Sequence, residues 1–365
     1  MSACYIASLS LSHFRSHRSA KLRFDGRPVA IYGPNGAGKT NLIEAVSLLS
    51  PGRGLRRAQA DALARRPEGV GWRIKAELSD TTEIEIRAAP GEPRRVKIND
   101  KAQPQLALAR HLRMLWLVPA MDRLWIEGAE GRRRFIDRAA MSFDPKHGEA
   151  VLGYEKAMRE RNRLLKDMVR DAHWYIALER QMAQMGARVH TGRQVAINAL
   201  MAAQQDAQTA FPTAELRQTY PEVGLEGEEG LLAALSEHRR RDMAAGRSLT
   251  GPHRADISAF WQAKDIEAKD CSTGEQKALL ISLVLANGRA LAQSGESPPI
   301  LLLDEVAAHL DAERRGALYD EVCALKAQAF LTGTGAELFA ELGDRAQVVE
   351  MSEGGSQAKE GLAND

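Results

Sequence analysis

The feature that most constrains this fold is a glycine-rich loop, G-P-N-G-A-G-K-T, at residues 33–40. The apolar run 29–31 precedes it as a short strand, and apolar residues at helical spacing follow it over 42–49. Glycines let the loop curl so that backbone N–H groups and the helix N-terminus face a phosphate. Lys39 then neutralises phosphate charge, and the Thr40 hydroxyl is placed to hold Mg²⁺. The strand–loop–helix unit therefore predicts an α/β fold with a nucleotide site, whose candidate residues are Gly33, Pro34, Asn35, Gly36, Ala37, Gly38, Lys39, Thr40 and Asn41.

A second motif consists of four apolar residues, 300–303, followed by Asp304 and Glu305. The apolar run is typical of a buried strand. An acid at the end of such a strand suits a direct or water-mediated contact with Mg²⁺, which we assign to Asp304. The next acid, Glu305, is placed to polarise an attacking water as the catalytic residue. Such runs are common, so this interpretation depends on the other motifs.

The third motif, C-S-T-G-E-Q-K at residues 271–277, opens an apolar helix. Ser272 and Gly274 offer a hydroxyl and free backbone N–H groups to an anion at the positive end of the helix dipole. The alternative is an ordinary helix cap, in which Glu275 completes a capping box. Because all three motifs occur in one order along the chain, the anion-binding interpretation is favoured.

Together the three motifs resemble the ABC-type P-loop ATPase head, and residues 271–276 are similar to its signature sequence. The resemblance implies an ATP site shared by two subunits, in which the signature of one covers the γ-phosphate held by the loop of the other. Residues 307–311 are similar to the loop that crosses this dimer interface. The expected assembly is an ATP-dependent homodimer.

Within this superfamily, which includes the SMC and Rad50 proteins, nearly the whole chain resembles the RecF family of bacterial DNA replication and repair proteins. The strings that carry the resemblance are L-S-H-F-R at 11–15, G-R-R-R-F-I-D at 131–137 and L-T-G-P-H-R-A-D at 249–256. It implies a dimer that binds duplex DNA at the edges of single-strand gaps and helps RecR and RecO place RecA on single strands. A role in recombination and in the SOS response belongs to the same expectation.

Three departures from the superfamily pattern bear on the rate of ATP hydrolysis. The segment 115–119 lacks the usual strand-end glutamine, no histidine follows the last buried strand near Thr332, and Cys271 replaces the leucine before the signature serine. We therefore expect a slow, DNA-stimulated ATPase that acts as a switch.

The helical period that begins near residue 146 predicts two long helices, interrupted near 172–175. We expect an inserted, mainly α-helical arm at 141–245. The two halves of the ATPase head then occupy 1–140 and 246–350, and a disordered, polar tail occupies 351–365.

Charge is distributed unevenly along the chain. Residues 1–140 carry 25 Lys and Arg against 14 Asp and Glu, whereas residues 246–365 carry 11 against 19. A basic segment favours a polyanion partner, although it could equally face the acidic segment across a domain or subunit contact. The best local candidates for DNA contact are Arg53, Arg56 and Arg57, and the alternative for them is a solvated surface. With aromatic residues at 5%, no stripe for stacking single-stranded bases is evident.

Two other function classes are disfavoured. Lys39 and Ser272 are 233 positions apart, more than the ATP-driving subunit of a membrane transporter allows. A chromosome-organising protein of the SMC or Rad50 kind needs hundreds of residues of heptads, which are not present. No apolar run approaches the roughly 20 residues that span a bilayer, and three widely spaced cysteines do not suggest a disulfide framework. We expect a cytoplasmic, nucleoid-associated protein with no membrane partner.

Overall fold

The structure, a computed structural model, describes residues 4–205, 207–222, 227–352 and 358–360. The chain divides into two compact units. The first unit consists of residues 1–122, 206–212 and 273–365, and the second of 123–205 and 213–272. The second unit is therefore an insertion in the first, and each unit joins segments that are distant in the sequence.

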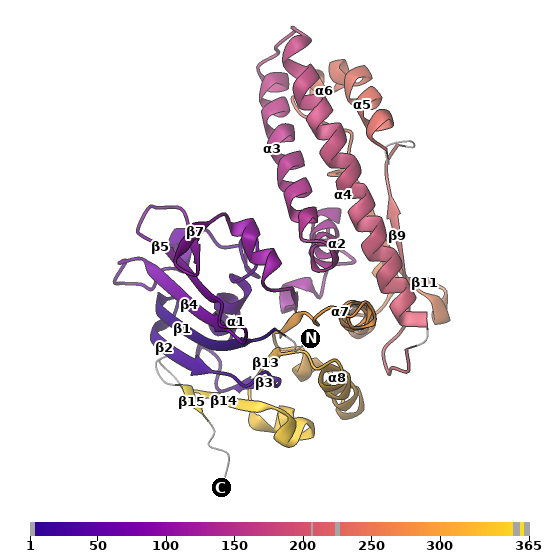
Figure 1. Cartoon of the computed structure of the whole chain (residues 1–365). Coiled ribbons are helices and arrows are strands. Elements are labelled where there is room, and N and C mark those ends of the chain that lie inside the picture. Colours follow the sequence, from indigo (N-terminus) through magenta and orange to yellow (C-terminus); the bar gives the residue numbers. More distant parts are fainter. Residues whose placement is uncertain (1–3, 206, 223–226, 353–357, 361–365) are drawn as a thin grey trace. The chain divides into compact units, whose positions relative to one another are not determined.

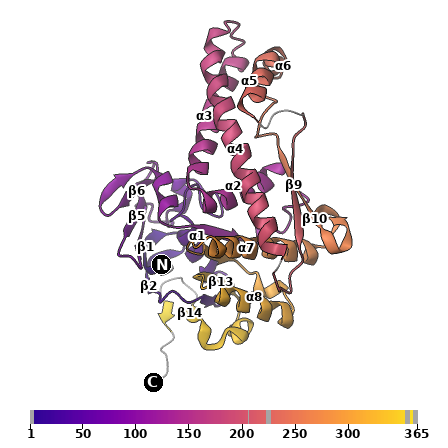
Figure 2. The ribbon, with the colours of Figure 1, turned by 45° about the vertical axis from the view of Figure 1, so that its right-hand side comes forward.

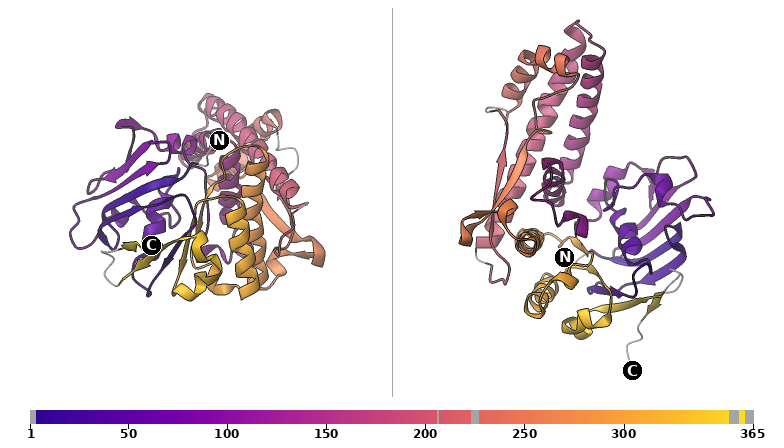
Figure 3. Two further views of the ribbon diagram at one scale, coloured as in Figure 1. Left: turned by 60° about the horizontal axis from the view of Figure 1, so that its bottom comes forward. Right: turned by 180° about the vertical axis from the view of Figure 1, so that it is seen from behind.

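One sheet of the first unit, here called the antiparallel sheet, contains six strands in the order β2-β1-β4-β5-β6-β7. Its strands are β1 (Ile6–Phe14), β2 (His17–Arg23), β4 (Trp72–Leu78), β5 (Glu83–Ala88), β6 (Arg95–Ile98) and β7 (Lys101–Gln103). Burial alternates along β4 and β5, so one face packs on the core and the other faces solvent. In Figure 3 these indigo and purple strands form one layer.

The second sheet of this unit has the order β15-β14-β3-β13-β12-β8, and all its pairs except β14–β15 are parallel. Its strands are β3 (Val29–Tyr32), β8 (Met114–Leu117), β12 (Ile300–Leu303), β13 (Ala329–Gly333), β14 (Gln347–Met351) and β15 (Ala358–Glu360). The unit's α-helices are α1 (Lys39–Ser47), α7 (Thr273–Gln293) and α8 (Ala312–Ala324). Helix α1 contacts both β1 and β13, and one apolar core joins the two sheets around it. Parallel strands end at a common edge, and the loops that carry the first two motifs follow β3 and β12 there.

The second unit is built on two long helices, α3 (Lys146–Lys166) and α4 (His173–Gln205), that lie side by side as Figures 1 and 2 show. They correspond to the two predicted helices, with the interruption before His173. The unit also contains α2 (Ala129–Phe143), α5 (Glu228–Glu237) and α6 (Arg239–Ala245), with strands β9 (Ala214–Thr219), β10 (Asp256–Trp261) and β11 (Ile266–Glu267).

The boundaries of this unit differ from the predicted arm, 141–245, on both sides. Helix α2 belongs to it because it packs against α4, and β10 belongs to it because it pairs with β9 in antiparallel register from Asp256 to Trp261. The prediction placed these segments in the head because it followed only the long helices, and a strand such as β10 is assigned to a sheet by a partner distant in the sequence.

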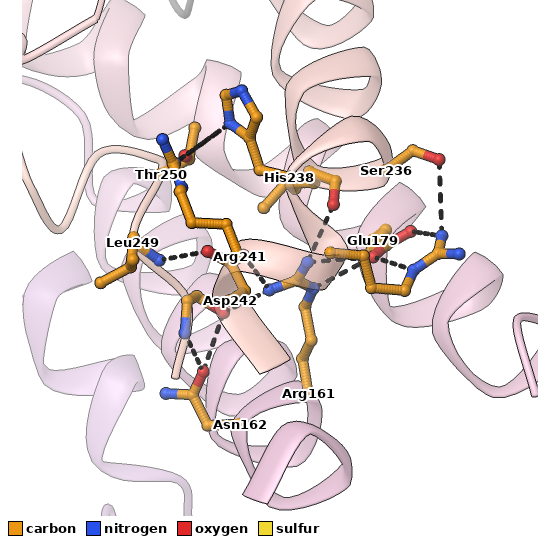
Figure 4. A network of polar contacts seen from close by, with 12 residues as sticks. Arg161, Asn162, Glu179, Ser236, His238, Arg241, Asp242, Leu249 and Thr250 are labelled. Atoms are coloured by element: carbon orange, nitrogen blue, oxygen red, sulfur yellow. Dashed lines mark hydrogen bonds and ion pairs between the residues drawn. The ribbon is translucent and has the colours of Figure 1, made fainter. Parts of the chain in front are cut away.

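A buried network of charges centres on Arg161 (Figure 4). This fully buried guanidinium donates to Glu179 Oε1 at 3.1 Å, Asp242 Oδ2 at 2.7 Å and the Leu235 carbonyl at 2.8 Å. Arg239 donates a 2.6 Å hydrogen bond to the other oxygen of Glu179. Helices α3, α4 and α6 are therefore joined by paired charges rather than by apolar contacts alone.

Two of the strings that carry the family resemblance, 131–137 and 249–256, contact each other in the second unit. Arg132 donates to both oxygens of Asp256, at 2.7 and 2.9 Å, and Arg133 donates to the Ala255 carbonyl. Tyr154 on α3 contacts Nδ1 of His253 at 2.7 Å. These residues hold α2, α3 and the start of β10 together.

At the C-terminus, Met351 ends β14, and β15 pairs with β14 in antiparallel register. The predicted disordered tail thus includes a described strand, and residues 353–357 and 361–365 lie outside the described residues. Among the helices described, none is both long enough and apolar enough to span a bilayer.

Candidate nucleotide-binding site

The glycine-rich loop joins the end of β3 to the start of α1. Gly33 has φ 149°, and a Cβ there would lie 2.1 Å from the Met351 carbonyl oxygen. Gly38, the residue before α1, has φ 98°, and its Cβ would lie 2.7 Å from Ser16 Oγ. Both positions therefore require glycine. Between them Pro34, Asn35 and Gly36 are exposed, so the loop can receive a ligand, while Ala37 is buried beneath it.

Lys39 is the first residue of α1, and its side chain turns back over the loop. Its Nζ donates to the carbonyl oxygens of Gly33 at 2.6 Å and Pro34 at 2.9 Å. Burial lowers the pKa of Lys39, and Glu305 and Asp304 oppose the shift. Both of these hydrogen bonds are to neutral carbonyls, which leaves the charge of the buried cation for an anion.

Asp304 lies at the centre of a cluster of hydroxyl groups. Its Oδ1 accepts from Thr332 Oγ1 at 2.7 Å and from Thr40 Oγ1 at 3.2 Å, which joins β12, β13 and α1. The carboxylate is 4% exposed, and burial raises its pKa, with the two hydroxyl bonds opposing the rise. Thr332 also accepts the backbone N–H of Glu305 at 2.9 Å, and Glu305 has φ 54°. A left-handed non-glycine residue at a strand end fits a side chain positioned for function.

The residues at this edge fit Mg²⁺ held jointly with a nucleotide. Thr40 and Asp304 present two oxygens that already contact each other, and Mg²⁺ commonly takes only one or two protein ligands beside phosphate oxygens and water. In the described part of the chain no cluster of three His, Cys, Asp or Glu could hold a metal alone. The donor set therefore suits a metal that arrives with its phosphate.

A second charged cluster forms around Asn41 and Glu44 of α1. Glu44 is fully buried, and both its oxygens accept from Arg15, at 2.8 and 2.9 Å. Arg56 donates to Asn41 Oδ1 at 2.8 Å and lies 3.4 Å from Glu44. Of the three arginines proposed for DNA contact, Arg56 thus contacts Asn41 and Glu44 on α1, and all three are exposed.

The signature segment lies at the start of α7. Ser272 and Gly274 are exposed, and Cys271 is buried at 7% exposure. A small buried thiol therefore occupies the place of the family's leucine.

Two functional candidates were not identified from the sequence. Thr332 follows three apolar residues in β13. A polar residue near the end of such a buried strand is the sequence feature that could have identified it. Lys277 on α7 is 95% buried, with Nζ 3.8 Å from Asp122 Oδ1, and burial lowers its pKa while Asp122 and Glu305 oppose the shift. The sequence feature that could have identified Lys277 is a lysine next to the apolar residues of a helix.

The chain is similar to proteins of one named family along nearly its whole length. The family model described as "RecF/RecN/SMC N terminal domain" matches residues 5–357. The DNA replication and repair protein RecF of Allorhizobium ampelinum is 45% identical, with 96% of this chain and 98% of the relative covered. The protein of the same name from Caulobacter vibrioides is 44% identical, covering 97% and 98%.

Solved structures show the same fold. A structure of the recombination mediator protein RecF with ATP superposes with a TM-score of 0.82 at 23% identity, covering 98% of this chain and 99% of the other. An Smc head domain from Pyrococcus yayanosii gives a TM-score of 0.59 at 14% identity, covering 98% and 97%. The predicted ABC-type head with an inserted helical unit is confirmed. The near-full-length similarity shows that this chain belongs to the RecF family.

Proposed function

We propose that this protein is an ATP-dependent DNA-binding protein of replication and recombinational repair. The observation that carries the proposal is the cluster of Thr40, Asp304 and Thr332 beside the glycine-rich loop, in a chain whose relatives are named for DNA replication and repair. The loop binds ATP, and DNA is the polyanion that the basic N-terminal segment contacts.

The chain's own residues divide the chemistry. Lys39 neutralises the β- and γ-phosphates, and the loop amides and the α1 N-terminus bind phosphate oxygens. Mg²⁺ supplies charge neutralisation on the phosphates, with Thr40 and Asp304 as its protein ligands. Glu305 accepts a proton from water, and the Thr332 bond to its backbone N–H fixes its position. Because Thr332 stands where the superfamily has a histidine, the proposed enzyme is a slow switch.

The exposed signature supports a shared site. Ser272 and Gly274 present a hydroxyl and an α7 N-terminus to solvent, where a second subunit's nucleotide can reach them. We infer an ATP-dependent homodimer that closes on duplex or gapped DNA. By family membership its partners are RecR, RecO and RecA, and its place is the cytoplasmic nucleoid.

The test compares two substitutions that should differ in kind. Lys39→Ala should abolish ATP binding, whereas Glu305→Gln should bind ATP, stop hydrolysis and accumulate as a dimer. Size-exclusion mass with ATP and duplex DNA measures the dimer, and nucleotide titration measures binding. A Glu305→Gln protein that hydrolyses ATP at the parental rate would remove Glu305 from the site.

A mixing experiment tests the shared site. Lys39→Ala and Ser272→Arg homodimers should each be inactive, because every site contains one damaged half. A mixed dimer rebuilds one intact loop facing one intact signature, so part of the ATPase activity and of the ATP-dependent dimerisation should return. If both variants dimerise normally alone and mixing recovers nothing, Ser272 is an ordinary helix cap.

A further inference from the structure

The solvent face of the antiparallel sheet is basic and polar. Cross-strand pairing places its outward residues in rows: Ser12, Ser19, Arg73, Arg87 and Arg95 in the first, Ser10, Lys21, Lys75, Glu85 and Lys97 in the second, and Ser8, Arg23, Glu77 and Glu83 in the third. The first row contains three cations and no acid. Positive charge on this face is therefore concentrated at one end of the sheet.

Arg73, Arg87 and Arg95, here called the arginine row, occupy directly opposed positions on β4, β5 and β6. All three are exposed, at 53% for the Arg87 side chain and 64% for Arg95. Like charges directly opposite each other destabilise a sheet. Two acids offset this only in part, since Glu92 pairs with Arg95 at 3.0 Å and Glu85 lies 3.8 Å from Arg87. The row is thus an arrangement that folding alone does not favour.

The same face is hollowed in two places. A hollow of about 400 Å³ is lined by the arginine row with Ser12, His13 and Gly71, and also by Glu92, Trp72 and Val70. A second, of about 440 Å³, is lined by Lys21, Arg23, Lys75 and Lys97 and equally by the acids Glu77, Glu83, Glu85 and Asp100. Gly71 has φ 85°, and a Cβ there would lie 2.5 Å from the Ala88 carbonyl oxygen, so the floor of the first hollow is close-packed backbone. The first hollow, with three arginines against Glu92, is basic and admits an extended anion, whereas cations and acids balance in the second.

The chemistry of the face favours a nucleic-acid backbone over a protein partner. Every outward residue in the three rows is Ser, Arg, Lys or Glu, and arginine, lysine and hydroxyl side chains are the usual donors to phosphates. Protein interfaces are instead centred on aromatic and apolar anchors. Single strands need aromatic stacking as well, and these rows contain no aromatic residue.

We propose that the arginine row and the adjoining lysines bind the sugar–phosphate backbone of duplex DNA, without reading its sequence. This rests on the proposed function, because it names the surface through which the ATP-dependent protein meets DNA. It differs from the earlier assignment of Arg53, Arg56 and Arg57, which lie in the segment after α1.

The test measures how binding of a labelled duplex of mixed sequence depends on salt, with ATP present. Arg73→Gln with Arg87→Gln should lower the log–log slope by about 2, since each duplex phosphate contact contributes about 0.9. Replacing both with lysine should keep most of the slope. The matched control, Lys326→Gln with Arg345→Gln, removes two exposed cations from elsewhere in the unit and should leave the slope unchanged. ATP binding should be parental in every variant.

Four outcomes would decide against the proposal. If the parent binds duplex and the glutamine pair leaves its slope unchanged, the surface assignment is wrong while the proposed function stands. If the parent does not bind duplex at all, the proposed function itself fails. If the control pair lowers the slope equally, net charge alone explains the effect. If the glutamine pair keeps duplex binding but loses binding to an acidic partner protein, the face is a protein interface.

Thermal stability gives an independent measurement. Because the row opposes like charges, Arg73→Gln should leave the melting temperature unchanged or raise it, most clearly at low salt. A melting temperature several degrees lower would show that the row supports the sheet rather than a ligand.

Discussion

The buried charges around Arg161 in the second unit and those at the candidate nucleotide site in the first are held by different kinds of partner. In the second unit Arg161 bonds to two carboxylates, a hydroxyl and a carbonyl. In the first unit Lys39 bonds to two carbonyls, and Asp304 accepts from two hydroxyl groups. Burial shifts the pKa of Lys39 down and that of Asp304 up, each toward the neutral form. Charges that are fully paired hold a fold together, and charges held only by neutral dipoles remain available to a ligand.

The largest expected effect is on the paired charges. Arg161→Ala should lower the free energy of unfolding by about 3–5 kcal/mol, because Glu179 and Asp242 would stay buried without their shared cation. Urea denaturation measures the loss. Arg163→Ala, two residues along α3 and 85% exposed, is the control and should change stability little. Equal small losses in both variants would contradict the contrast between the units.

A pH experiment sharpens the same contrast in the second unit. Burial lowers the pKa of His253 to about 4, against about 6.5 unfolded, so the unfolded chain binds the proton more readily. The free energy of unfolding should therefore fall as pH drops below about 6.5. The decrease should reach about 2 kcal/mol at pH 5, and the curve should level off below about pH 4. His253→Gln should remove this part of the pH dependence, measured by thermal or urea unfolding from pH 7 to 4.5.

The control for that experiment is His173→Gln, whose ring is 90% exposed on the same unit. It should reproduce the parental pH profile. An unchanged profile for His253→Gln would show that His253 is not the titrating group.

In the first unit, the Thr332 hydroxyl lowers the pKa of Asp304 against the effect of burial. Thr332→Val should raise that pKa further, so Mg²⁺-dependent ATP binding should weaken about fivefold, the equivalent of one hydrogen bond of about 1 kcal/mol. The loss should grow as pH falls, because the proton competes with the metal. Titration of ATP with and without Mg²⁺ across pH tests this, and the exposed Thr334→Val is the control.

The smallest stability effect is expected at Lys39. Lys39→Ala removes two hydrogen bonds and also the cost of burying a cation, so unfolding without nucleotide should change by no more than about 1 kcal/mol in either direction. Thermal melts should show that ATP stabilises the parent and not the variant. A loss as large as that of Arg161→Ala would mean that Lys39 supports the fold.

Much of the candidate site's local structure could be predicted because its signals are local. The glycine pattern at 33–40 requires a curled loop, and the apolar run before Asp304 requires a buried strand, whatever surrounds them. The long helices of the second unit were equally readable from their period. The contacts of Arg56 could not be predicted, because a run of arginines does not show which one contacts Asn41 and Glu44.

The sequence by itself therefore determined the curled glycine-rich loop, the acidic strand end, the helical pair and the family. Only the tertiary structure decided that Thr332 reaches Asp304, that β10 joins β9 in the second unit, and that Arg73, Arg87 and Arg95 stand in one row. The physical reason is the distance along the chain over which the deciding interactions act. Loop curvature and helical period are set by neighbouring residues, whereas strand register and the pairing of buried charges are set by segments that meet only when the chain has folded.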